Sequence, residues 1–361
     1  MTGKELQTGC PKRMVNGPCG GVRDGLCEVD GRQCPYIQAD TKHIENPIIG
    51  PGMIKKGLPP NPAEKPRILR QLEDGNKLLF LELEPSRRGT GRRLLEQAGY
   101  FKRIVDGYTI TDNPLGRVQA DPLAALALLR MNNFEEIIVT HISSKDRNRA
   151  ALTSLAIGSL WLRVDGFLAL TGDWPGFMAG KTKPVFDLDS VRLVYMLRLL
   201  RDHGLDYMGG KIKEVPTFSV AVAFNSHATP ISHEIARLVA KKRAGAEIVF
   251  TQPVLHPSDL EKVKEARSIV LGKAGMLYFI PTVMVVRTPS EALMLHEKAR
   301  IKIPSSLIEG LQRKGIEYSM QYTVKQVEEI LSKPWVSGVM IATHGDLEVN
   351  KRLAKMVKDM F

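Results

Sequence analysis

Apolar residues recur through most of the chain as short runs separated by amphipathic segments. Segments such as 122–133, 190–204 and 231–245 carry apolar residues three and four positions apart, and several end in Asn or Gly, as is typical of helices. Eight apolar runs between such segments indicate buried parallel strands, and their number predicts an α/β fold of the (β/α)8 TIM barrel type. A doubly wound sheet is the alternative, but no GxGxxG follows the first run. The runs are 77–83, 104–110, 136–141, 166–171, 217–224, 247–252, 276–285 and 338–343.

The first part of the chain has a different pattern. Residues 1–45 are rich in Gly, Cys and Asp and show no sustained period, which predicts a small loop-built module that a core alone does not stabilise. Residues 46–66 contain six prolines and three glycines and predict a linker. We therefore expect a cysteine-rich metal-binding module at 1–45, a linker at 46–66 and a catalytic barrel at 67–361.

All four cysteines of the 361-residue chain lie in this first module. The gaps between them hold eight, seven and six residues, so the CxxC pair that is common in structural zinc sites is absent from the sequence. The glycines between them would let backbone N–H groups approach sulfur, as they do around iron–sulfur clusters. The pattern favours a [4Fe–4S] cluster on Cys10, Cys19, Cys27 and Cys34, with zinc or no metal as alternatives.

The cellular setting bears on these thiols. The N-terminus lacks the apolar segment of a secretory signal, and no stretch approaches 18 consecutive apolar residues. We therefore expect a cytoplasmic protein without a membrane span. In that compartment a dense set of cysteines more often binds metal than forms disulfides.

The net charge of +12 is spread along the chain in small basic groups at 87–93, 145–149 and 241–243. A nucleic-acid-binding protein usually gathers such charge on one face and adds aromatic residues for stacking, whereas aromatic residues make up only 6% of this chain. We expect no nucleic-acid partner. Most of these side chains fit solvated helix faces, and a few fit the binding of an anionic small molecule.

Polar residues follow the strand-like runs, where the active sites of (β/α)8 barrels lie. The first run ends in two acidic residues, Glu82 and Glu84, which share a strand face. From position along the chain we assign Glu84 and Asn113 to substrate binding. The candidates for cofactor binding at the other strand ends are Thr111, His141, Asn225 and His227.

Several of these segments together resemble the methylenetetrahydrofolate reductase family. LELEP (81–85), TDN (111–113), LALTGDWP (168–175), AGAEIVFTQ (244–252) and PTVMVV (281–286) occur in the family's order, and the resemblance covers about residues 67–345. The cysteine stretch also resembles a small module that is fused to, or partnered with, some family members. The resemblance implies an oxidoreductase acting on CH–NH groups, a flavin-bearing barrel of one-carbon metabolism. Such a barrel transfers hydride to 5,10-methylene-tetrahydropterin and forms the 5-methyl pterin.

The resemblance also implies roles for individual residues. Glu82 would be the general acid that helps to open the five-membered ring of the substrate, and burial at the end of an apolar strand would raise its pKa for that task. Glu84 is the competing candidate, and a structural carboxylate paired with Arg87 or Arg88 is the alternative for Glu82. Asp173 would lie beside the flavin and the pterin and stabilise the cationic iminium. Gln252 would bind the pterin, and Lys241 would contact the phosphates of the flavin.

The chain departs from the family pattern in loops that would face the flavin and the substrate. Thr171 stands where the family commonly has Arg, ELEPS replaces EFFPP, and residues 112–115 replace a Tyr-Gly-Ala-Gly run. These departures leave open FAD, FMN or no flavin, and they leave open a folate or a methanopterin substrate. No separate dinucleotide-binding fold is visible, so electrons would come from NAD(P)H at the barrel mouth, from a ferredoxin-like carrier or from a partner subunit. A homo-oligomer or a subunit of a complex is compatible with the sequence.

Two other functions are compatible with parts of the pattern. A pterin-dependent methyltransferase barrel that passes a methyl group to a corrinoid protein would use the same pterin site without hydride chemistry. A basic nucleic-acid-binding protein, whose N-terminal loops a metal holds together, is another possible function, but it would not explain the polar residues at the strand ends. The reductase is therefore the leading hypothesis, and the methyltransferase is its alternative.

Overall fold

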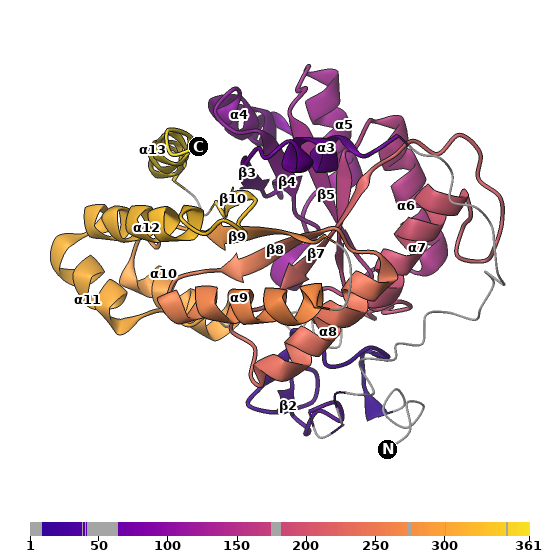
Figure 1. The fold of residues 1–361 in the computed structure, drawn as a ribbon, viewed down its shortest axis with the longest axis horizontal. Coiled ribbons are helices and arrows are strands. Elements are labelled where there is room, and N and C mark those ends of the chain that lie inside the picture. Colours follow the sequence, from indigo (N-terminus) through magenta and orange to yellow (C-terminus); the bar gives the residue numbers. More distant parts are fainter. Residues whose placement is uncertain are drawn as a thin grey trace.

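A computed structural model of the chain describes residues 9–37, 39, 41, 64–174, 182–272, 276–299, 301–343 and 346–361. Most of the predicted linker, residues 46–63, lies outside the described residues. The boundaries of the three predicted parts therefore stay predictions. The figures show the described elements with their labels (Figure 1).

All eight predicted strands form one closed parallel barrel, in the order β10-β3-β4-β5-β6-β7-β8-β9 (Figure 1). The prediction of a (β/α)8 TIM barrel is confirmed. Each strand pairs in parallel with its neighbours, and β10 closes the barrel against β3. The strands are β3 (Leu78–Leu83), β4 (Gly107–Ile110), β5 (Ile137–Ser143), β6 (Gly166–Leu170), β7 (Ser219–Phe224), β8 (Ile248–Pro253), β9 (Tyr278–Val283) and β10 (Gly338–Ile341).

Helices surround the barrel and connect its strands (Figure 1). Polar N-caps begin several of them: Asp121 before α5, Asn148 before α6 and Asp189 before α7 accept hydrogen bonds from the first helical turn. The helical elements are α3 (Arg67–Glu73), α4 (Arg92–Phe101), η1 (Pro114–Gly116), α5 (Pro122–Met131), α6 (Arg149–Trp161), α7 (Ser190–His203), α8 (Ile231–Ala244), α9 (Pro257–Leu271), α10 (Pro289–Met294), η3 (Leu295–Ala299), α11 (Ser305–Lys314), α12 (Ile316–Leu331) and α13 (Leu347–Lys358).

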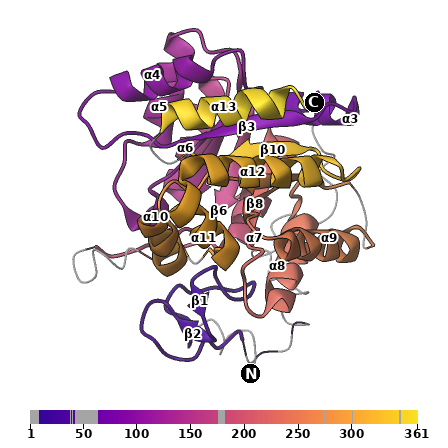
Figure 2. The ribbon, with the colours of Figure 1, turned by 90° about the vertical axis from the view of Figure 1, so that its left-hand side faces the viewer.

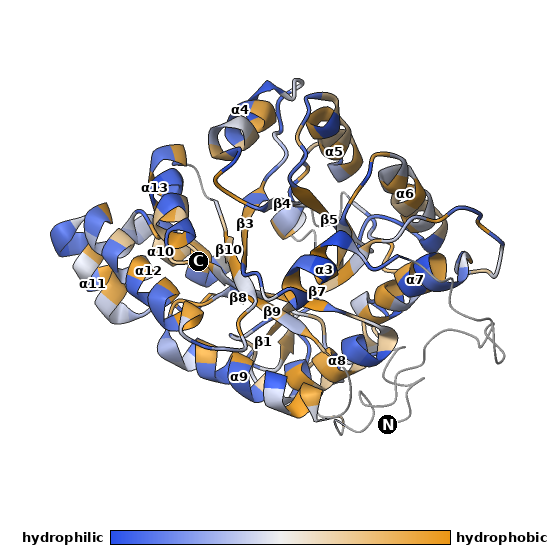
Figure 3. Cartoon of the chain, turned by 45° about the horizontal axis from the view of Figure 1, so that its top comes forward, coloured by the Kyte–Doolittle hydropathy of each residue, from blue (hydrophilic) through white to orange (hydrophobic). Residues whose placement is uncertain are grey.

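The side chains of each strand divide between two hydrophobic cores, as the two-residue period of a strand requires. On β3, Leu79 and Leu81 pack outward against the helices, whereas Phe80 packs inside the barrel. Ile68 and Leu72 of α3 join the inner core and cover one end of the barrel (Figure 3). The opposite end, where the strands finish, is free to carry the site.

The cysteine module contains a short antiparallel hairpin of β1 (Val22–Arg23) and β2 (Leu26–Cys27). In two perpendicular views the hairpin and α3 lie at opposite ends of the barrel (Figures 1 and 2). The module therefore lies at the C-terminal mouth of the strands. None of the helices in the described ranges combines the length and apolar character that crossing a bilayer requires.

Candidate functional site

A cavity of about 1550 Å³ opens at the C-terminal ends of the strands. Active sites of (β/α)8 barrels lie at this end. The volume exceeds the roughly 300–1,000 Å³ of a common small-molecule pocket, so the cavity is large enough for two ring systems. It is lined by the predicted residues Glu82, Glu84, Thr111, His141, Asp173, Asn225, Lys241 and Gln252.

The Glu82 carboxyl lies at the end of β3, on the inward strand face that also carries Phe80. Burial and, to a smaller extent, the charge of Glu84 together raise its pKa to about 8. Among the described residues, no ion pair joins Glu82 to Arg87 or Arg88. Glu82 is therefore a partly buried carboxylic acid that is mostly protonated at neutral pH, and it lines the cavity.

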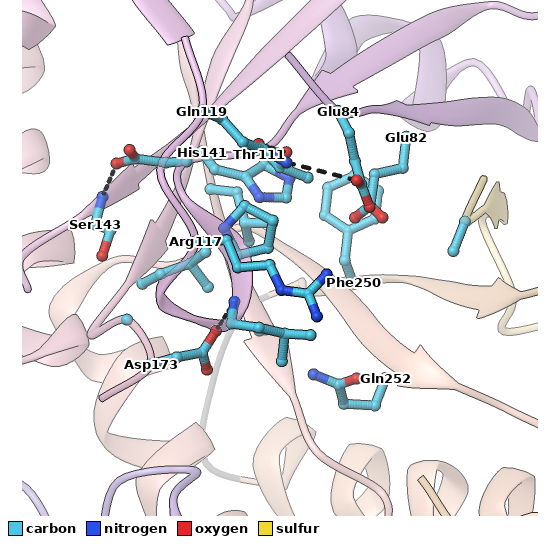
Figure 4. Close-up of a pocket in the computed structure, with 18 of the residues that line it drawn as sticks. Glu82, Glu84, Thr111, Arg117, Gln119, His141, Ser143, Asp173, Phe250 and Gln252 are labelled. Atoms are coloured by element: carbon cyan, nitrogen blue, oxygen red, sulfur yellow. Dashed lines mark hydrogen bonds between the residues drawn. The ribbon is translucent and has the colours of Figure 1, made fainter. Parts of the chain in front are cut away.

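A hydrogen-bond chain orients the second carboxylate at this end of β3. Gln119 Nε2 donates to Glu84 Oε2 at 3.5 Å, and Thr111 Oγ1 donates to Gln119 Oε1 at 3.1 Å (Figure 4). Gln119 thus links the loop after β4 to the end of β3. Its amide satisfies a carboxylate and a hydroxyl at once.

Asp173 is held by a strained loop. Its Oδ2 accepts a hydrogen bond from the Leu115 backbone N–H at 2.7 Å (Figure 4). Leu115 has a φ of 54° and Asn113 a φ of 47°, in the left-handed region that is unfavourable for a leucine. The loop after β4 accepts this strain and presents an N–H group that fixes the Asp173 carboxylate at the cavity.

His141 presents an unused polar atom to the cavity. Its side chain is 6% exposed, and Nε2 has no hydrogen-bond partner among the described residues. Burial lowers its pKa to about 3, so the imidazole is neutral at physiological pH. A buried polar atom without a partner costs stability, and a ligand in the cavity would supply the missing hydrogen bond.

Lys241 lines the cavity from α8, but its ammonium group is engaged within the protein. Nζ donates to the Ala223 carbonyl at 2.6 Å and lies 3.9 Å from Glu234 Oε1. Burial and the charge of Arg237 together lower the pKa of Lys241 to about 7. Contact of Lys241 with cofactor phosphates stays a prediction, and it would require these bonds to open.

Two predicted residues are not among those that line the cavity. His227 Nε2 bonds the Pro253 carbonyl at 2.9 Å, and Nδ1 lies 3.6 Å from Asp259, so the ring ties the loop after β7 to the end of β8. Asn113 Oδ1 accepts from the Gln119 N–H at 2.7 Å. In this structure both side chains support loops that carry the site.

Arg117 and Phe250 are among the lining residues that sequence reasoning missed. The Arg117 guanidinium extends into the cavity between Glu82 and Gln252 (Figure 4). Phe250 precedes Gln252 by two positions on β8, so strand alternation alone could have placed it on the same face. No periodic signal indicates Arg117, because it lies in an irregular loop.

The cysteine module forms part of the cavity wall, through Gly20, Gly21 and Glu28. Lys12 Nζ forms an ion pair with Glu28 and donates to the Gly172 carbonyl, in the loop after β6, at 3.3 Å. The module and the barrel therefore share one site, although they are far apart in the sequence.

A buried carboxylate holds the module against the barrel. Asp189 is 1% exposed, and its Oδ2 accepts from the backbone N–H groups of Val15 and Asn16 at 3.1 and 3.2 Å. The Asn16 side-chain amide donates to the same carboxylate at 3.1 and 3.0 Å. Arg237 of α8 adds a hydrogen bond to the Pro18 carbonyl. Charge-assisted bonds of this kind are the stronger class of protein hydrogen bonds.

The four cysteines carry free thiols around the hairpin. Burial raises the pKa of the Cys10, Cys27 and Cys34 thiols, that of Cys34 to about 11. The proximity of Cys19 also contributes to the raised pKa of each of these three thiols. Within the described ranges, no three His, Cys, Asp or Glu side chains are arranged to hold a metal ion. Four thiols are suitable ligands for a thiophilic metal, although the described side chains are not arranged around a common centre.

Comparison with known sequences decides the family. Residues 67–356 match the family model described as methylenetetrahydrofolate reductase. The chain belongs to this family. The resemblance of the strand-end segments is therefore confirmed over the barrel of this methylenetetrahydrofolate reductase family member.

Other comparisons add detail to the family assignment. Residues 5–47 of this methylenetetrahydrofolate reductase family member match a second model, described as methylene-tetrahydrofolate reductase C terminal. No curated protein matches the sequence. A solved structure of an uncharacterized protein from Clostridium thermocellum, which binds two copies of 5-methyl-5,6,7,8-tetrahydrofolic acid, aligns with a TM-score of 0.58 at 13% identity. The alignment covers 81% of this chain and 100% of that chain, and it shows a shared fold.

Proposed function

We propose that this family member reduces a 5,10-methylene-tetrahydropterin to the 5-methyl form, with Glu82 as the general acid. The observation that supports this most is the state of Glu82. A carboxyl group with a pKa of about 8, at the inner end of a barrel strand, is protonated at neutral pH and opens onto a cavity of suitable size. Ordinary carboxylates near pH 7 are ionised and cannot donate a proton.

The chemistry requires such an acid. The five-membered ring of the substrate opens to an iminium when a pterin nitrogen takes up a proton, and the methylene carbon then accepts hydride. Glu82 supplies the proton. The carboxylate of Asp173, fixed by the Leu115 N–H, stabilises the positive charge of the iminium. Gln252 and Arg117 face the same cavity and orient the pterin.

The cavity also fits a flavin, which would supply the hydride when bound. The neutral His141, whose Nε2 is buried and unpaired in the described structure, provides a hydrogen bond that such a ring system would complete. Thr111 and Asn225 are the other candidates for its binding. Lys241 is the weakest candidate because Ala223 and Glu234 engage its ammonium group.

The proposal predicts that the protein purified under anaerobic conditions oxidises 5-methyltetrahydrofolate with an artificial dye as electron acceptor. Bound flavin should bleach when the methyl pterin is added. The same spectral change should be measured with NADH, NADPH and reduced ferredoxin, because these separate the three classes of electron donor. Protein that holds no flavin and instead transfers the methyl group to a cob(I)alamin protein would contradict the reductase and favour the methyltransferase.

We further propose that Cys10, Cys19, Cys27 and Cys34 bind a metal centre, with a [4Fe–4S] cluster favoured over zinc. The prediction is about four iron and four acid-labile sulfide per chain in protein purified anaerobically, with an EPR signal after reduction. Replacing Cys19 by Ser should lower the metal content, because Cys19 interacts electrostatically with each of the other three cysteines. One zinc per chain without iron would exclude the cluster.

A further inference from the structure

The cysteine module places a buried ammonium group against the loop that carries Asp173. Lys12 is 2% exposed, and its Nζ donates to the Gly172 carbonyl at 3.3 Å. Gly172 directly precedes Asp173, the residue proposed to stabilise the iminium. Lys12 is not among the residues that line the cavity, and the proposed chemistry does not use it. Any effect of Lys12 on the site therefore passes through the loop after β6.

Partners from both the module and the barrel surround the Lys12 ammonium. Glu28 of the module pairs with it, and the ring of Phe186, which precedes α7, has its centroid 5.0 Å from Nζ. The Phe186 ring is stacked on Trp174, with the centroids 6.1 Å apart and an angle of 10° between the planes. Trp174 directly follows Asp173. Lys12 therefore contacts the residue before Asp173 directly and the residue after it through one aromatic ring.

The backbone at these contacts adopts conformations that its surroundings must maintain. Gly172 has a φ of 90°, and a Cβ at this position would lie 2.2 Å from Ser143 Oγ, so glycine is required there. Phe186 has a φ of 43°, in the left-handed region that is unfavourable for a residue with a large side chain. The hydrogen bond from Lys12 to Gly172 and the cation–π contact with Phe186 help to hold these conformations. Loss of the ammonium group should therefore release the loop.

Asp173 is tied to a second loop as well as to its own. Its Oδ2 accepts from the Leu115 N–H at 2.7 Å, so the direction of the carboxylate depends on where the loop after β6 lies relative to the loop after β4. Burial lowers the pKa of Lys12, but nearby charges, Glu28 and Asp173 among them, raise it by more. The charged ammonium group thus attracts the Asp173 carboxylate and also holds the backbone beside it.

We propose that Lys12 is a positioning residue, which aligns the Asp173 carboxylate with the cationic intermediate of the reaction. This rests on the proposed function of the same cavity. The cysteine module then contributes to catalysis through a side chain that does not itself line the cavity. Because alignment matters most where charge develops, loss of Lys12 should lower kcat and leave KM nearly unchanged.

The kinetic test replaces Lys12 by Met, which removes the charge and the donor and keeps an unbranched side chain. For reduction of the methylene pterin, kcat should fall about tenfold, part of the roughly 100-fold that a misplacement of about 1 Å can cost, and KM should change by less than about twofold. In the Asp173→Ala background the same replacement should change kcat by less than about twofold, because Lys12 acts through the carboxylate that is then absent. Arg32→Gln, which breaks an exposed ion pair with Asp30 in the same module, is the matched control and should keep the wild-type kcat and KM.

Hydrogen exchange of the Leu115 amide provides a readout that needs no substrate. This N–H donates to Asp173, so its exchange reports the position of the carboxylate rather than the contacts of Lys12 itself. Lys12→Met should accelerate the exchange about tenfold, on the scale of one lost charge-assisted hydrogen bond. Asp173→Ala should accelerate it at least as much, and adding Lys12→Met to that variant should cause no further change. Arg32→Gln should exchange as the wild type does.

The two readouts separate failure of this proposal from failure of the proposed function. Unchanged Leu115 exchange in Lys12→Met, or an equal loss of kcat with and without the Asp173 carboxylate, overturns the positioning role. A rise in KM with unchanged kcat also overturns it, because Lys12 would then act on substrate binding. If the wild type reduces no methylene pterin, the proposed function fails, and the Leu115 exchange alone decides whether Lys12 holds Asp173 in place.

Discussion

Replacing Glu82 by Gln is expected to lower the rate of 5,10-methylene-tetrahydropterin reduction by about 10²- to 10⁴-fold, the usual contribution of a positioned general acid. Gln keeps the size and polarity of the side chain but cannot deliver a proton. In the wild type the pKa of about 8 keeps the acid protonated at neutral pH, so methylene reduction should decline as pH rises above about 8. The measurement is the pH profile of kcat for both proteins.

The matched variant is Glu84→Gln, which removes the neighbouring charge and leaves the acid in place. Because the Glu84 charge raises the pKa of Glu82, its removal should lower that pKa. The alkaline limb of the wild-type profile should therefore move to lower pH while activity at pH 6 is retained. If Glu84→Gln abolishes activity and Glu82→Gln spares it, the roles of the two carboxylates are reversed.

Stability provides a second readout for Glu82 that does not depend on the substrate. The pKa of Glu82 is raised in the folded state, so the folded protein binds the proton more tightly than the unfolded chain between about pH 4.5 and 8. The free energy of unfolding of the wild type accordingly falls as pH rises through this window. Glu82→Gln should gain stability relative to the wild type, on the order of a few kcal/mol at pH 8 and little at pH 4.

The barrel could be predicted because its information is local. Each strand is a short apolar run, and each connecting helix has its own apolar period. Six of the eight strands lie within their predicted runs, and the other two continue one or two residues beyond the end of the predicted run. The run 276–285 is longer than the strand Tyr278–Val283 for a physical reason. Met284 and Val286 leave the barrel and pack in a separate core with Leu255 and Leu307 beneath α10 and α11.

The candidate site was predicted where side-chain direction follows from strand parity and missed where loops decide it. Glu82 and Gln252 stand at strand ends, and alternation with buried neighbours turns them toward the cavity. His227 is in a loop, and the Pro253 carbonyl of another strand binds its ring. The arrangement of Arg117 depends on a loop with left-handed residues, which no period in the sequence indicates.

The docking of the cysteine module is the part least accessible to sequence reasoning. An aspartate before a helix is typical of an N-cap, and Asp189 does accept from the Arg192 N–H at 3.0 Å. The same carboxylate also binds Asn16, which is 173 positions away in the chain. No local sequence pattern distinguishes an aspartate that only caps a helix from one that also binds a distant segment of the chain.

Replacing Asp189 by Ser should separate the module from the barrel. Ser retains the N-cap of α7, but it loses the carboxylate whose Oδ2 accepts from the backbone N–H groups of Val15 and Asn16 and from the Asn16 side-chain amide. Loss of a buried charged acceptor with several donors costs about 3 kcal/mol. This corresponds to an increase of about 100-fold in the opening equilibrium of residues 12–21. Hydrogen exchange measured by mass spectrometry on peptides from this segment reports it directly.

Asp187→Ala is the matched control, because Asp187 is two residues away and pairs with Arg149 without contacting the module. It should leave the exchange of residues 12–21 unchanged. Since Gly20, Gly21 and Glu28 form part of the cavity wall, Asp189→Ser should also weaken binding of the methyl pterin, whereas the exchange of the barrel strands should change little. If both variants give the same exchange for residues 12–21, contacts other than the Asp189 carboxylate hold the module, and Lys12 with Gly172 becomes the next pair to test.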